Sequence, residues 1–71
     1  MNASEYRQTI AALGETITGA AHRLGVNERT SRDWAEVRRE VRQVPEQVAR
    51  TLRFLKRRGI SLAEFERDAR P

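Results

Sequence analysis

The chain has 71 residues, a net charge of +4 and no cysteine, and because so short a chain buries only about 60% of its unfolded surface, we expect one domain spanning residues 1–71. The lack of cysteine excludes disulfides, thiolate catalysis and zinc sites built on cysteine. No apolar run reaches the roughly 18 to 20 residues of a membrane span, and the N-terminal residues lack the layout of a signal peptide, so we expect a cytoplasmic protein without membrane contact.

The first predicted helix begins after Asn2, whose side chain can cap it while Glu5 completes a capping box. Gly14 can end this helix. The residues that share its apolar face are Tyr6, Ile10 and Leu13.

The second predicted helix runs from a cap at Thr16 to a stop at Gly25, and it carries Ala20, Ala21 and Leu24. Asn27 follows shortly after the stop, and its side chain can cap a third helix. The sequence therefore predicts two short helices joined by a glycine-containing turn of about three or four residues.

The length of the third helix is open. An apolar stripe with helical spacing could carry it to about Gln43, because no glycine or proline interrupts the chain before Pro45. The residue before a proline disfavours the helical conformation, which predicts a break near Val44. Residues 36–43 could therefore extend the helix or form a loop. The stripe consists of Thr30, Trp34, Val37, Val41 and Val44.

Two more helices complete the prediction. Pro45 can open a helix over Glu46–Arg58 that ends at Gly59, and Ser61 with Glu64 forms a capping-box pair for a last, short helix. Their apolar stripes are Val48, Leu52 and Leu55 in the longer helix and Leu62, Phe65 and Ala69 in the shorter one. Since no segment alternates as a strand does, we expect an all-α fold, a compact bundle of about five short helices.

Positive charge is concentrated in the middle of the chain. Residues 29–58 hold ten basic and four acidic side chains, a net charge of +6. Such asymmetry favours a polyanionic partner, although a basic surface can also serve solubility alone. Lys56, Arg57 and Arg58 could contact phosphate, or they could complement the dipole of the helix that they end.

The stretch LGETITGAAHRLGVNERTSRDW, with the later VPEQVARTLRFL, resembles the helix-turn-helix of the Cro and phage-repressor type, also called the xenobiotic-response-element family, over residues 2–55. Ala21 is small where two helices would cross, Gly25 can take a positive φ at the turn, and Trp34 can fill the space between the helices. The resemblance implies a lambda-repressor-like fold and a small, often dimeric, often phage-derived transcriptional regulator.

The resemblance also implies which residues contact DNA. The 28–36 helix would enter the major groove, with Glu28, Arg29 and Asp33 at positions that meet base edges. Helical geometry agrees independently, because at about 100° per residue Trp34 and Ala35 point inward. The side chains that point away from the core are Arg29, Arg32, Asp33 and Glu36. The candidate DNA contacts are Thr16, Thr18, Asn27, Glu28, Arg29, Arg32, Asp33, Arg38 and Arg39.

The chain departs from the family pattern at three places. Ile17 stands where a glutamine usually contacts phosphate, and Ser31 stands where a valine or isoleucine is usually buried. A buried Ser31 would have to bond a nearby carbonyl. The segment AEVRREVRQV is longer than usual, and as a helix extension it would present Arg38 and Arg39 to flanking phosphates; a solvated helical face is the alternative.

We therefore predict a sequence-specific double-stranded DNA-binding regulator, a homodimeric repressor of phage or bacterial type that binds a pseudo-palindromic operator. The alternative is a helix-turn-helix-fold protein-interaction module, a phage or plasmid accessory protein that does not read DNA. The departures and the acids of the third helix favour this alternative, and the i,i+4 pairs Arg29 with Asp33 and Arg32 with Glu36 would lower the effective positive charge.

We expect no enzyme activity, because the sequence has no catalytic triad, phosphate loop or metal cluster and is too short for a large pocket. The single histidine, His22, has no second ligand at useful spacing, so we expect it at the surface or its boundary, with no metal, cofactor or small-molecule ligand. The sequence offers two candidate dimer surfaces, the last helix and the stripe that contains Val37 and Val41, and does not decide between them.

Overall fold

A computed structural model describes residues 1–36 and 43–69, and in these residues it contains five helices and no strand. The helices are α1 (Ala3–Ala12), α2 (Ile17–Leu24), α3 (Glu28–Trp34), α4 (Glu46–Arg58) and α5 (Leu62–Ala69). The Cα radius of gyration is 11.2 Å, close to the roughly 11 Å of a compact chain of this length. The expected all-α, compact bundle of short helices is confirmed.

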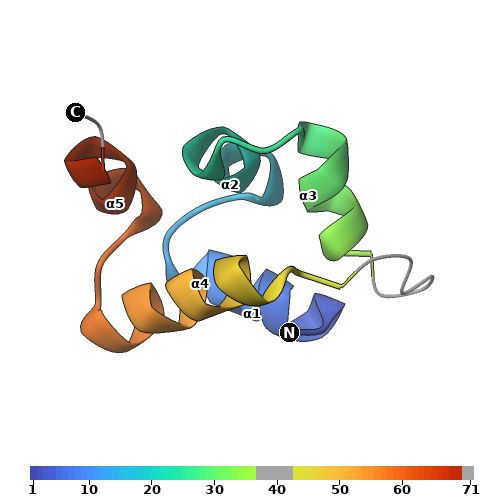
Figure 1. Ribbon diagram of the computed structural model, residues 1–71, viewed down its shortest axis with the longest axis horizontal. Helices are drawn as coiled ribbons and strands as arrows, with labels where there is room; N and C mark the ends of the chain where they lie inside the picture. Colours follow the sequence, from blue (N-terminus) through green and yellow to red (C-terminus); the bar gives the residue numbers. More distant parts are fainter. Residues whose placement is uncertain (37–42, 70–71) are drawn as a thin grey trace.

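The helices form two groups that share one core. α2 packs against α3 and α5, α1 packs against α4, and a contact between α1 and α2 joins the groups. Figure 1 shows α2 between α3 and α5, with α1 and α4 together on the other side of the molecule. Each helix in the described residues is too short or too polar to span a bilayer.

The predicted caps form, with one correction. The Asn2 Oδ1 atom accepts from the N–H of Glu5 at 2.8 Å, and the Thr16 Oγ1 atom accepts from the N–H of Gly19 at 2.9 Å. The Glu5 carboxylate, however, does not return to Asn2: its two oxygens accept from Arg53 of α4 at 2.9 and 3.2 Å. The capping box predicted for Glu5 is therefore wrong, because a charged partner on another helix takes its carboxylate.

The turn between α2 and α3 spans residues 25–27. Gly25 adopts the left-handed conformation, with φ +73°, and the N–H of Val26 reaches back to the carbonyl of Ala21 at 2.9 Å. This hydrogen bond satisfies a carbonyl at the end of α2. Asn27 then caps α3, its Oδ1 atom accepting from the N–H of Arg29 at 2.8 Å.

α3 is shorter than the predicted 28–36 helix and does not continue toward Gln43. It ends at Trp34, with Ala35 as its C-cap. The Ala35 carbonyl, which a continuing helix would use internally, accepts from the Arg7 Nε atom of α1 at 2.6 Å. The N–H of Glu36 bonds to the carbonyl three residues back, which tightens the last turn. The predicted roles of Arg38, Arg39, Val37 and Val41 fall outside the described residues.

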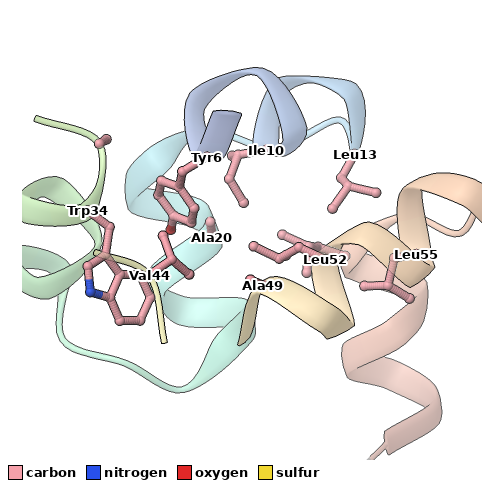
Figure 2. Packing of buried hydrophobic residues seen from close by; sticks show 11 residues of the cluster. Tyr6, Ile10, Leu13, Ala20, Trp34, Val44, Ala49, Leu52 and Leu55 are labelled. Carbon is pink, nitrogen blue, oxygen red and sulfur yellow. The ribbon is translucent and has the colours of Figure 1, made fainter. Parts of the chain in front are cut away.

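The core runs between the two helix groups. Figure 2 shows Trp34, Val44 and Tyr6 at one end of it and Leu13 and Leu55 at the other. The ring planes of Tyr6 and Trp34 meet edge to face at 86°, with centroids 5.7 Å apart, a favoured geometry for two aromatic rings. The predicted inner faces of α1 and of α4 are confirmed in Tyr6, Ile10, Leu13, Leu52 and Leu55, and Val48 is partly buried and packs against the same core. Ala49 of α4 is fully buried as well, and Ala69, which was expected on the inner face of α5, is exposed.

Candidate functional site

Ser31 fixes the middle of α3 against two other helices. Its Oγ atom donates to the carbonyl of Ile17, the first residue of α2, at 2.8 Å, and lies 2.6 Å from the hydroxyl of Tyr6 on α1. Because a serine hydroxyl has one proton and Ile17 takes it, the Tyr6 hydroxyl is the donor in the second bond. Ser31 is fully buried. The prediction that a buried serine here would bond a carbonyl is confirmed.

The Tyr6 hydroxyl is neutral when it donates to Ser31. Burial raises the pKa of the Tyr6 hydroxyl above its ordinary value, and the hydrogen bond with Ser31 opposes this only in part. The hydroxyl therefore keeps its proton and remains a donor at neutral pH. Together with Trp34 and Ala35, which are also buried, these contacts hold the inner face of α3 in place.

The outer face of α3 carries the predicted base-contacting residues. Arg29 and Arg32 are exposed, and Asp33 is half-buried. Within residues 1–36 and 43–69, neither guanidinium group makes an ion pair or a hydrogen bond. The expected pairs of Arg29 with Asp33 and of Arg32 with Glu36 are therefore wrong. Two positive groups on this face thus have no partner among the residues that the structure describes.

Glu28 is the exception on this face, because it has a partner. Its Oε1 atom lies 2.8 Å from the His22 Nε2 atom, and the two side chains are 45% and 68% exposed. The contact joins the last turn of α2 to the first residue of α3. The sequence indicated only a surface histidine, and no periodic pattern predicts a pair that forms across a turn.

The remaining candidates lie around the start of α2 and of α3. Thr16 and Asn27 use their side-chain oxygens as helix caps. Thr18 is exposed in the first turn of α2. Because the carbonyl of Ile17 bonds to Ser31, this turn lies beside the middle of α3. The structure thus places Thr16 and Thr18 close to the helix that carries Arg29. The two other candidates, Arg38 and Arg39, lie outside the described residues.

A groove of about 250 Å³ lies elsewhere, where the α1–α2 turn meets the α4–α5 turn. Among its lining residues, Lys56 supplies one cation and Ser61 one hydroxyl. In the part of the chain that the structure describes, no three histidine, aspartate or glutamate side chains are grouped so as to hold a metal ion.

Comparisons of the chain with protein-family models, with curated proteins and with solved structures found no match. The resemblance to Cro and phage-repressor proteins therefore stays a prediction from the residues.

Proposed function

We propose that this protein is a sequence-specific double-stranded DNA-binding regulator, a homodimeric repressor of phage or bacterial type, that places α3 in the major groove. The observation that carries the proposal is the pair of exposed guanidinium groups, Arg29 and Arg32, on a short helix whose opposite face is fixed. Arginine bonded to guanine O6 and N7 is the commonest specific contact in the major groove.

The dimensions of α3 support this arrangement. An α-helix with its side chains is about 10 to 12 Å in diameter, and the major groove, about 12 Å wide, admits one. With 7 residues, α3 is about 10 Å long at 1.5 Å per residue. The first turn of α2 lies beside α3, so the exposed Thr18 hydroxyl could bind a phosphate that borders the groove. Such contacts set the orientation of α3 and leave base reading to its outer face.

The acids of α3 suit base reading better than general affinity for DNA. Glu28 and Asp33 can accept a hydrogen bond from cytosine N4, and the contact with His22 holds the Glu28 carboxylate close to α2. Two copies of α3 would read half-sites about 34 to 36 Å apart, which is one turn of DNA. The proposed place of action is the cytoplasm, where bacterial and phage genes are transcribed.

Binding-site selection from random duplex DNA, followed by titration of the selected site, tests the proposal. Arg29→Ala and Arg32→Ala should each lower the affinity for the selected site by about 5- to 150-fold, the loss of one bidentate base contact. Arg67→Ala is the matched control, because Arg67 is an exposed arginine of α5, on the other side of α2 from α3. Circular dichroism checks that each variant is folded.

The salt dependence gives a second readout. If about six phosphates are neutralised, log K should fall with log salt at a slope near −5. A flat salt response, or folded Arg29→Ala and Arg32→Ala variants that bind as tightly as Arg67→Ala, would contradict the proposal.

One observation favours the second candidate, a protein-interaction module that does not read DNA. The outer face of α3 and the residue after its C-cap carry three acids, Glu28, Asp33 and Glu36, against two arginines. A mixed surface of this kind suits a protein partner of mixed charge. Failure of the selection to enrich any duplex, with the protein folded, would favour this candidate over the regulator.

A further inference from the structure

The outer face of α4 is a second basic surface. Ala49, Leu52 and Leu55 are buried on one side of the helix, and at about 100° per residue Arg50, Phe54 and Arg57 fall on the opposite side. α4 packs against α1, whereas α3 packs against α2, so the two basic surfaces belong to different helix groups (Figure 1).

Phe54 lies at the centre of this face. Its side chain is 43% exposed, and no other large hydrophobic side chain in the described residues is exposed. The guanidinium carbon of Arg58 lies over its ring, 5.4 Å from the centroid, which is within the range of a cation–π contact. The ring is therefore held beside a cation at the surface instead of being packed into the core.

The cations around Phe54 have little neutralisation from the protein itself. Arg57 makes no ion pair with a described residue. Arg50 meets Glu46 at 3.8 Å, with side chains that are 80% and 73% exposed, and an exposed pair of this kind contributes little. The face thus presents three guanidinium groups and one carboxylate around an exposed ring.

Complementing the helix dipole does not account for this arrangement. It explains Arg57 and Arg58, which lie in the last turn of α4. It explains neither Arg50, which lies in the second turn, nor an exposed aromatic ring between the cations. Arg50 and Arg58 are each four residues from Phe54, about 6 Å along the helix axis, so the ring has a cation on each side of it.

We propose that the outer face of α4 binds single-stranded nucleic acid, with an unpaired base stacked on Phe54 and the neighbouring phosphates bound by Arg50 on one side and Arg57 on the other. Stacking on an aromatic side chain combined with cationic contacts to the backbone is the general chemistry of single-strand recognition. A duplex keeps its base faces inside the stack, so the exposed ring favours an unpaired strand. This activity is separate from the proposed reading of duplex DNA by α3.

Fluorescence anisotropy of the full chain with labelled oligothymidylate and oligouridylate tests the proposal, with a duplex of matched length as the comparison. Phe54→Ala should weaken single-strand binding by about 5- to 150-fold, the loss of one stacked base. Phe54→Leu should weaken it nearly as much, because leucine keeps apolar bulk and loses the π face, whereas Phe54→Trp should retain it. Arg50→Ala and Arg57→Ala should each make the salt slope shallower by about 0.7.

The controls separate this proposal from the function of α3. Arg67→Ala should leave single-strand binding unchanged, and so should Arg29→Ala, which acts on duplex binding alone. A folded Phe54→Leu variant that binds single strands like the wild type would overturn the proposal. So would binding only to vesicles of anionic lipid, or a Phe54-dependent doubling of the molecular mass in solution, which would assign the face to a membrane or to a second copy of the chain.

Discussion

At the scale of single residues, one buried hydroxyl connects three helices. The Ser31 hydroxyl on α3 bonds Tyr6 of α1 and Ile17 of α2 at once. No buried side-chain nitrogen or oxygen in the described residues lacks a partner. Hydrogen bonds thus fix the orientation of α3 about its own axis, which apolar contacts alone would restrict less.

The Tyr6–Ser31 bond makes a measurable prediction. Ser31→Ala should lower the free energy of unfolding by about 1–3 kcal/mol, because it leaves the buried Tyr6 hydroxyl without a partner, and Tyr6→Phe should lower it by about 0.5–1.5 kcal/mol. The double variant should lose less than the two single losses combined, because in it the tyrosine hydroxyl is absent. Urea denaturation measures all three, with exposed Ser4→Ala as the control, and strict additivity would count against the bond.

At the scale of elements, the sequence predicted how the helices start better than how far they run. Caps such as Asn2, Thr16 and Asn27 act on N–H groups two or three residues away, so a local pattern contains them. The end of α3 depends on Arg7, which lies 28 residues earlier. No spacing of apolar residues within the helix could show that contact, and the stripe through Val44 was compatible with a longer helix as well as with a loop.

The turn between α2 and α3 should be sensitive to its conformation alone. A Cβ atom built on Gly25 would meet no atom within 4 Å, yet φ is +73°. Gly25→Ala should therefore cost about 1–2 kcal/mol of stability through backbone strain, and Gly25→Asn should cost less because asparagine tolerates this region. Thermal unfolding compares the two. Equal losses would show that the turn does not hold the left-handed conformation.

At the scale of the whole molecule, charge pairs connect helices that are distant in the sequence. Arg53 bonds Glu5 and so joins α4 to α1, and Arg23 contacts both Glu15 and Glu66, which joins α2 to α5. The sequence contains these charges but does not predict their partners, because one sequence alone does not show which helix faces pack against each other. For the same reason the pairing of His22 with Glu28 and the exposed ring of Phe54 were not predicted.

The Glu5–Arg53 pair predicts a dependence of stability on pH. The hydrogen bond from Arg53 lowers the pKa of the Glu5 carboxyl. A carboxyl with a lowered pKa in the folded state stabilises the fold above the ordinary glutamate pKa of about 4.3, and this contribution is lost as pH falls through the lower, folded value. Glu5→Gln should therefore reduce the drop in melting temperature between neutral pH and about pH 3.

Glu46→Gln is the control for this measurement, because Glu46 has only a longer contact with Arg50, at 3.8 Å. In this variant the decrease in melting temperature between neutral pH and about pH 3 should stay close to that of the wild type. If both variants reduced the drop equally, the effect would belong to net charge and not to the bond between α1 and α4.

The hydroxyl pair of Tyr6 and Ser31 also constrains how this chain can change over generations. If the serine is replaced first, the buried Tyr6 hydroxyl is left without a hydrogen-bond partner. If the tyrosine hydroxyl is lost first, the hydrogen bond that holds α3 against α1 is lost. A protein with apolar side chains at both positions would be stable, but either order of replacement passes through a single variant that is less stable. In a small domain with roughly 4 to 10 kcal/mol of total stability, such a step is a barrier to drift, so descendants should keep both hydroxyls or have replaced both.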